Sequence, residues 1–462
     1  MLRTLRALLP ALLLAAAAWA QAPDGFTPPH VLMIGIDTWR GDHLGRTGND
    51  WIETPHLDAL AADGVAFSRC YSTAPWTLPS FASIMTGLLP YRHGAVGGEY
   101  QRLGEDHVTL AEYLAAGGYA TAGFVSINYL SPEYGMGQGY TVTAPPGLDL
   151  DLDRADRITW LGLETLRTRD LSQPHFLFLH YFDVHAPYAP PPPYDRMYYR
   201  GNETAPGPTV LSFVRSDANR APNKTTAMYD WLGDVTDLQF PVKQYAAGVS
   251  YVDDHVGQIV AYLKQRGLYD RMLIVVVSDH GEHLGEHDLW FTHLEPYQEC
   301  LHVPLLIKLP HNAFGGQVLD EPVSTLDVLP TVLDALTVRP PEDIDGRTLL
   351  PLIAGQTQGH RTRLMAEQGA VPGSFVKTLI DWPWKIMVSE RPAEGRRVRL
   401  FNLNDDPYET VDLAAEHAAK AERMERRLWR TFDPENPIVE GRLPIPADVD
   451  EETRRKLEAL GY

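Results

Sequence analysis

Short, almost continuous apolar runs recur along this 462-residue chain, and they constrain its fold more than any other feature. The run His30–Ile36 ends at Asp37, and the run Met272–Val277 ends shortly before Asp279. Runs this short are typical of strands buried on both faces of a parallel sheet. Apolar residues at positions 245, 249, 252, 256, 259 and 263 mark one face of a long helix that ends at Gly267. Strands that alternate with helices predict a mostly parallel sheet covered on both faces.

The pattern divides the chain into one large unit and one small one. Residues 27–355 carry the alternating strands and helices, with further strands expected at Tyr119–Val125, His175–Phe182 and Val303–Ile307. Within this unit, residues 189–240 are rich in proline and lack periodicity, which predicts a long surface excursion that covers the site. From 356 to 462 the apolar runs are short and alternating. They predict a small antiparallel sheet, followed by a terminal helix at Glu451–Leu460.

Residues 1–20 have the features of a secretory signal peptide. Arg3 and Arg6 precede the apolar run Ala7–Ala18, and Ala18–Ala20 offers small residues for cleavage. A membrane anchor is the alternative, but the run is shorter than the ~20 apolar residues of a spanning helix and contains Pro10. We therefore predict an exported protein, periplasmic or extracellular, with no stable membrane span after cleavage.

Charge and cysteine content exclude several classes of function. The chain has 40 Lys and Arg against 60 Asp and Glu, which gives a formal charge of −20. A surface this acidic argues against nucleic acids as partners and favours a small anionic substrate over a polyanion. Two cysteines cannot form a disulfide framework or a Cys-based zinc site, and whether Cys70 and Cys300 pair is left open. Chemistry must therefore rest on His, Asp, Glu and hydroxyl groups.

Two predicted strands end in residues that bind metals. Asp37 follows the first strand, and Asp279-His280 follows the strand Met272–Ser278. In parallel sheets, functional sites form at the carboxyl ends of the strands. A single Asp at such a place usually caps a helix, but two carboxylates and an imidazole together favour a divalent cation. Three more histidines follow closely, at positions 283, 287 and 293.

A second candidate segment surrounds Thr77. Pro79 suits the first turn of a helix, which would place the Thr77 hydroxyl near the amino end of that helix, where anions are favoured. The alternative is that Thr77 only caps the helix.

Four segments resemble, in order, the motifs of the sulfatase family, which belongs to the alkaline phosphatase superfamily. They are Val31–Gly45, Ala74–Gly94, His185–Tyr188 and Ser278–Pro310. The resemblance covers nearly the whole chain after the signal. It implies an α/β/α sandwich with a mostly parallel central sheet and a smaller C-terminal antiparallel sheet.

The family pattern implies which residues form the catalytic centre. Asp37, Asp279 and His280 match its metal ligands. Thr77 stands at the position of the nucleophile, where its hydroxyl would also bind the metal. His185 matches the histidine of a His-x-Pro motif near the bound ester.

Further residues are candidates for catalysis or ester binding. His293 takes the place of a lysine that is common in sulfatases, and we predict a catalytic role for it. Asn128 lies near the expected place of a sulfate-binding block that this chain lacks. Arg40 and His93 are candidates for holding ester oxygens, although capping or surface roles suit them equally well.

The departures from the family pattern decide the predicted mechanism. Sulfatases oxidise a Cys or Ser, within C-x-P-x-R, to formylglycine. Thr77 cannot yield that aldehyde, and Phe81 replaces the Arg, so no formylglycine is expected. At least one divalent metal ion is implied, with Ca, Zn and Mn left open, and Asp183, His185 and His293 are available for a second.

We therefore predict a metal-dependent hydrolase that cleaves phosphate or sulfate esters through a metal-activated Thr77, with phosphate favoured. One alternative is a transferase that moves a phospho group onto a glycan or lipid, although such relatives usually carry several membrane spans. Another is an inactive sulfatase-like binding protein, against which the complete metal set argues. The oligomeric state is left open.

Overall fold

The computed structural model describes residues 28–96, 101–144, 154–216, 227–369, 374–392 and 394–432. The predicted signal peptide, 1–20, and the predicted helix Glu451–Leu460 lie outside these ranges.

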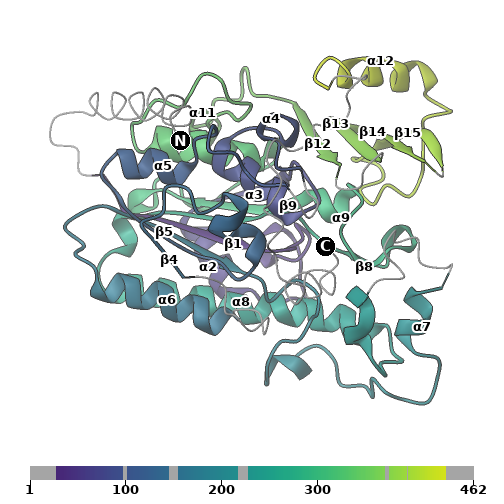
Figure 1. The fold of residues 1–462 in the computed structure, drawn as a ribbon, viewed down its shortest axis with the longest axis horizontal. Coiled ribbons are helices and arrows are strands. Elements are labelled where there is room, and N and C mark those ends of the chain that lie inside the picture. The colour runs from purple at the N-terminus through teal and green to yellow at the C-terminus, as the bar shows by residue number, and fades with distance from the viewer. Residues whose placement is uncertain are drawn as a thin grey trace.

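A nine-stranded sheet forms the centre of the molecule (Figure 1). Strand β1 (Val31–Ile36) lies in its middle, between β5 (His175–Tyr181) and β6 (Leu273–Ser278), and is parallel to both. Strands β3 (Ala120–Phe124) and β4 (Val142–Ala144) continue the parallel part beyond β5. All six residues of β1 are buried, as expected for a strand covered on both faces.

Beyond β6 the sheet becomes mixed. Strand β9 (His302–Lys308) is antiparallel both to β6 and to β2 (Val65–Tyr71). Two short strands, β10 (Gln317–Leu319) and β11 (Val323–Ser324), pair with β2 and end the sheet on this side. The predicted strands are therefore present, and the sheet is mostly parallel, as predicted.

Helices cover both faces of the sheet and enclose two separate hydrophobic cores. One face carries α2 (Pro55–Asp63), α6 (Ala155–Thr168) and α8 (Gln239–Gln265). The other carries α3 (Thr77–Thr86), α5 (Leu110–Ala116), α10 (Val328–Ala335) and α11 (Leu350–Ile353). The predicted apolar face of α8 is buried throughout, from Tyr245 to Leu263. The predicted α/β/α sandwich is confirmed.

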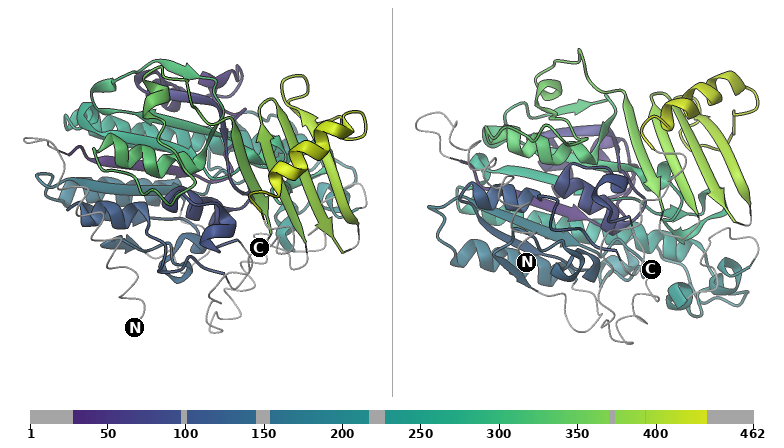
Figure 2. Two further views of the ribbon diagram at one scale, coloured as in Figure 1. Left: turned by 90° about the horizontal axis from the view of Figure 1, so that it is seen from above. Right: turned by 45° about the horizontal axis from the view of Figure 1, so that its top comes forward.

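The C-terminal part forms the predicted antiparallel sheet. Its strands are β12 (Arg363–Gln368), β13 (Phe375–Asp381), β14 (Trp384–Arg391) and β15 (Gly395–Asn402). Helix α12 (Ala418–Leu428) lies across one face of this sheet, as Figure 2 shows. Strand β12 and helix α12 were not among the predicted elements.

The excursion at 189–240 packs on the main domain through aromatic rings. It contains α7 (Val210–Val214) and a short helical turn at Ala227–Leu232. Trp231 contacts Phe291, and Phe213 contacts Trp290, each with ring centroids 5.8 Å apart. These two partners belong to the hairpin of β7 (His283–Leu284) and β8 (Trp290–Thr292), which follows the predicted metal ligands.

Two other expectations concern membranes and cysteines. None of the helices in the described ranges has the length and apolarity required to cross a bilayer. Cys70 and Cys300 are both buried and both free.

Candidate active site

The register of the central strands brings the predicted metal ligands together. Ile36 of β1 pairs with Ser278 of β6, so Asp37 and Asp279 follow at adjacent strand ends. Both carboxylates are fully buried, as is His280. Asp279 accepts hydrogen bonds from the backbone N–H groups of Thr38 (3.2 Å) and His280 (2.8 Å), which fix its position.

Thr77 begins helix α3 and faces this group. Its hydroxyl donates to Asp37 Oδ2 at 3.4 Å and lies 3.3 Å from His280 Nε2. Trp76, not Thr77, takes the N-cap position of the helix. The Thr77 hydroxyl is therefore directed at the predicted metal ligands.

Asp37, Asp279 and His280 fit a divalent cation. Each offers a ligand atom, and these atoms lie within 4.8 Å of one another. Asp37 Oδ1 and Asp279 Oδ2 are buried and have no hydrogen-bond partner within the described part of the chain. The Nδ1–H of His280 points at the carbonyl of Gly281 (2.9 Å), which leaves Nε2 facing the carboxylates, an arrangement typical of metal-binding histidines.

Burial in this cluster disfavours the ionisation of both carboxyl groups, Asp37 and Asp279. Burial, and then the charge of Asp37, raise the pKa of Asp279 to about 7. Burial, and then the charge of Glu282, raise the pKa of Asp37 well above its usual range. Burial also lowers the pKa of His280 to about 3, so its imidazole is neutral. A bound cation would favour the ionised carboxylates and the neutral imidazole.

His185 and His293 stand beside the cluster. The His293 ring lies between the other two imidazoles, with centroids 4.5 Å from that of His280 and 5.1 Å from that of His185. The Nδ1 atom of His185 lies 2.5 Å from the carbonyl oxygen of Ala186. Burial lowers the pKa of both His185 and His293 to about 3, so both rings are neutral.

Two residues at the site were not predicted. His180 on β5 places Nε2 3.2 Å from Asp37 Oδ2, and its position opposite Gly35 explains the approach. Glu282 is buried, and its Oε1 lies 3.6 Å from His293 Nδ1. Burial raises the pKa of Glu282 to about 7. A polar residue inside an apolar run is the sequence signal that could have indicated His180.

Two further predicted site residues, Arg40 and His93, contact other side chains of the protein. Arg40 is buried, with its guanidinium 2.7 Å from Asp42 and 2.8 Å from Glu286. His93 contacts the hydroxyl of Ser83 on α3 at 3.0 Å. Ester binding by these residues stays a prediction.

Asn128 follows β3 and Asp183 follows β5, whereas the predicted metal ligands follow β1 and β6. Asn128 is half-buried and begins a helical turn after β3. The carboxylate of Asp183 accepts a hydrogen bond from the backbone of Ala155, at the start of α6. A second metal at Asp183 therefore has no support from this placement.

The C-terminal sheet holds the segment that carries His293. Arg391 of β14 forms an ion pair with Glu295, two residues beyond His293, and Arg399 of β15 lies 4.0 Å from the same carboxylate. The backbone carbonyl of Glu295 also lies 3.2 Å from His283 Nε2. The position of His293 thus depends on both domains.

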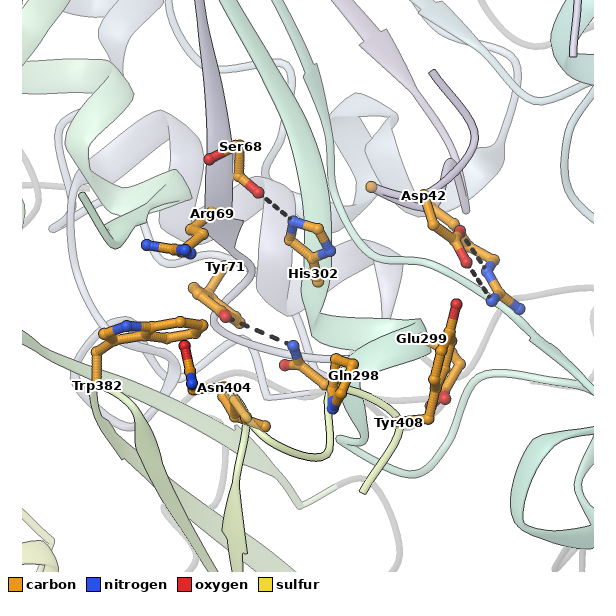
Figure 3. A pocket seen from close by; sticks show the side chains of 14 residues that line it. Asp42, Ser68, Arg69, Tyr71, Gln298, Glu299, His302, Trp382, Asn404 and Tyr408 are labelled. Carbon is orange, nitrogen blue, oxygen red and sulfur yellow. Dashed lines mark hydrogen bonds and ion pairs between the residues drawn. The ribbon is translucent and has the colours of Figure 1, made fainter. Parts of the chain in front are cut away.

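A pocket of about 330 Å³ opens between the two domains, beside Arg40 (Figure 3). Tyr71 and Gln298 line it from the large domain, and Trp382 and Tyr408 from the small one. Glu299 also faces this pocket. Asp37, Thr77 and Asp279 are not among its lining residues.

Comparison with known proteins places the chain in a family. The sequence model of the sulfatase family matches residues 29–338, and a model described as N-sulphoglucosamine sulphohydrolase, C-terminal, matches residues 285–433. The chain belongs to the sulfatase family, within the alkaline phosphatase superfamily, and is a hydrolase of that superfamily. The predicted family is confirmed.

Individual relatives agree with this assignment. An arylsulfatase of Clostridium perfringens is 26% identical over 442 residues, which cover 83% of this chain and 90% of the relative. A structure solved in complex with its substrate D-glucosamine-2-N,6-O-disulfate superposes with a TM-score of 0.71 at 20% identity, covering 88% and 97%. A phosphonate monoester hydrolase of Agrobacterium radiobacter superposes with a TM-score of 0.70 at 23% identity, covering 87% and 95%. The last two show likeness of fold.

Proposed function

We propose that this protein is an exported, metal-dependent hydrolase that cleaves phosphate or sulfate esters with the Thr77 hydroxyl as nucleophile. The observation that carries the proposal is the position of that hydroxyl, 3.4 Å from Asp37 Oδ2 and 3.3 Å from His280 Nε2. A threonine hydroxyl is a weak nucleophile until its proton is removed. The proposal therefore needs both a base and a cation close to Thr77.

The cation would be held by Asp37, Asp279 and His280, with the Thr77 hydroxyl as a further ligand. When bound, it would supply positive charge that lowers the pKa of the hydroxyl and neutralises the ester oxygens. Asp37 can accept the proton of Thr77, because the hydroxyl already donates to its Oδ2. His180, 3.2 Å from the same oxygen, orients Asp37.

The leaving alcohol requires a proton. His293 is suited to position that oxygen, because its ring lies against His280 and its Nδ1 faces Glu282 at 3.6 Å. Glu282, with a pKa raised to about 7 by burial, can hold a proton near neutral pH. Attack by Thr77 leaves a phospho- or sulfo-threonine, and water must cleave it at phosphorus or sulfur.

The substrate would be a small anionic ester, with phosphate favoured over sulfate. Phosphate is favoured because Thr77 closes the route through formylglycine and because Phe81 replaces the arginine of the family motif. The named relatives include both a sulfatase and a phosphonate monoester hydrolase, so both kinds of ester remain in the proposal.

A substrate screen tests the proposal. The purified chain is assayed with aryl phosphate monoesters, aryl phosphate diesters and aryl sulfates, before and after removal of metal by a chelator. We expect turnover of at least one ester, its loss on chelation and its recovery when a divalent cation is restored. Failure to hydrolyse any of these esters in the metal-loaded state would contradict the proposal and favour a binding protein.

A further inference from the structure

A second group of potential metal ligands lies between the two domains, apart from the Thr77 site. His287, Glu299 and Glu409 each offer one ligand atom, and these atoms lie within 4.8 Å of one another. They come from three places in the chain: the turn between β7 and β8, helix α9 (Gln298–Leu301), and the loop after β15. The group therefore joins the segment from Asp279 to His293, which carries predicted catalytic residues, to the small C-terminal domain.

Glu299 is the centre of this group. Its residue is only 4% exposed, and neither carboxylate oxygen has a hydrogen-bond partner within the described ranges. Two imidazole nitrogens face its Oε2 atom, His287 Nε2 at 3.5 Å and His283 Nδ1 at 3.9 Å. A buried carboxylate that lacks hydrogen bonds is costly unless a positive charge is close to it.

The proton of His283 is directed away from Glu299. His283 Nε2 lies 3.2 Å from the backbone carbonyl of Glu295, an acceptor that requires an N–H at this position. In the neutral ring, Nδ1 then presents a lone pair toward the oxygens of Glu299, and two lone pairs repel one another. A histidine that donates one N–H to a carbonyl and turns its other nitrogen to a carboxylate is characteristic of a metal ligand.

His287 is held in place at an energetic cost. Its backbone adopts φ 57° and ψ 21°, the left-handed region that a residue with a side chain seldom takes. Its ring stacks on Tyr297 with centroids 3.7 Å apart and planes 10° apart. Backbone and stacking together direct Nε2 toward Glu299, as a preorganised ligand requires.

Glu409 is already partly engaged. Its Oε1 lies 2.7 Å from Lys385 Nζ, and its Oε2 accepts the backbone N–H of Gln298 at 2.7 Å. Lys385 therefore balances the charge of Glu409, while the nearby guanidinium of Arg40 is bound by Asp42 and Glu286. The charges of Arg40 and Lys385 also act on Glu299, but each of these cations contacts another carboxylate, so a cation between His287 and Glu299 would add a positive charge in direct contact with Glu299.

We propose that His287, Glu299 and Glu409, with His283 beside them, form a second site for a divalent transition cation. Two imidazoles and carboxylate oxygens suit Zn²⁺ best. Ligands at about 2.0–2.1 Å from a tetrahedral zinc are separated by about 3.3 Å, close to the distances of 3.5 and 3.9 Å around Glu299. The interdomain pocket gives an ion a route to Glu299 (Figure 3).

A metal ion at this site would link the large and small domains next to the segment that carries His293. It is independent of the proposed hydrolysis, since it needs neither Thr77 nor an ester. The alternative is that no metal binds and that His287 carries a proton on Nε2, so that His287 and Glu299 form an ordinary buried ion pair.

Metal counting distinguishes the two. The full chain is equilibrated with Zn²⁺, dialysed against metal-free buffer and analysed for zinc per chain. We expect two equivalents in the wild type, one in Asp279→Asn, and one in each of His287→Gln and Glu299→Gln. His56→Gln is the matched control, because the His56 side chain is 47% exposed, and it should keep two.

Each outcome decides the matter. One equivalent in the wild type and none in Asp279→Asn would overturn the second site, as would two equivalents in both His287→Gln and Glu299→Gln. If His287→Gln fails to fold, the equivalent that remains in Asp279→Asn still answers the question. In that Asp279→Asn protein, a chelator should lower the melting temperature, and the added change Glu299→Gln should abolish this effect. Because zinc is counted, not turnover, failure of the proposed hydrolysis would not affect the result.

Discussion

Replacing Thr77 by valine tests the nucleophile directly. Valine keeps the branched shape of threonine but removes the hydroxyl. The hydroxyl makes two long contacts, at 3.3 and 3.4 Å, so its loss should lower the free energy of unfolding by only about 1 kcal/mol. Removing a catalytic nucleophile, by contrast, lowers kcat by a factor on the order of 10³ or more.

The assay is the turnover of the best aryl ester found in the screen. It is combined with urea unfolding and with the metal content of each variant, because Asp37, Asp279 and His280 remain in place. Acid-quenched wild-type protein should also carry a phosphoryl or sulfuryl group on the peptide that contains Thr77, and Thr77→Val should not. Thr86→Val is the control, since that hydroxyl lies at the other end of α3 and donates to the carbonyl of Ala82.

A stable Thr77→Val protein with kcat within about tenfold of the wild type would refute the assignment. The same change in kcat for both variants would show that the loss comes from damage to α3 and not from the missing nucleophile.

Three further predictions address pH, charge and packing around the site. In metal-free protein, burial raises the pKa of Asp279 to about 7 from its usual value of 3.8, so Asp279 loses its proton at lower pH in the unfolded chain than in the folded one. Its contribution to stability should therefore fall as pH rises between these values. Melting temperatures of the wild type and Asp279→Asn, taken with a chelator at about pH 5 and about pH 8, check this. The buried histidines, whose pKa values are lowered, act in the opposite direction in both proteins, so the change from the lower to the upper pH should be less favourable in the wild type, and an equal change in the two would contradict the prediction. Lys385→Met should lower the free energy of unfolding by about 3–5 kcal/mol in urea titrations, because it leaves Glu409 charged and buried, and a loss below about 1 kcal/mol would be inconsistent with this pair. In Gly281→Ala the new Cβ would lie 1.9 Å from a backbone oxygen of α9, so the free energy of unfolding should fall by more than about 2 kcal/mol. Gly207→Ala is the control, because the nearest atom to its Cβ is 4.0 Å away, and it should change the free energy of unfolding by less than about 0.5 kcal/mol.

The sequence predicts the fold well wherever burial is continuous. Strands such as β1 and β6 are buried on both faces, so their apolar runs stand out against any neighbouring segment. Helix α8 was predictable because its buried face repeats over many turns. The strand β12 was missed because two of its buried residues, Glu367 and Gln368, are polar and interrupt the apolar pattern. The helix α12 was missed because its three buried residues are separated by charged ones.

The site is less completely predictable, because its geometry depends on register. Asp37 and Asp279 can be identified because each follows a strand. Parallel strands all end at the same edge of the sheet, so both residues must lie at that edge. The approach of His180 to Asp37 depends instead on which residue of β5 lies opposite Gly35, and the sequence does not specify this. Arg40 illustrates the reverse: its charge suggested an anion site, whereas the structure pairs it with Asp42 and Glu286.

The ion pair between Arg391 of the C-terminal sheet and Glu295 affects when the site can form during protein synthesis. Synthesis runs from the N-terminus, so the segment with His293 leaves the ribosome about a hundred residues before Arg391 and Arg399 follow it. Until then, nothing from β14 or β15 can hold that segment against His280. With His293 in its proposed role, activity is therefore among the last properties that a growing chain acquires, and an incomplete chain should be unable to act on esters.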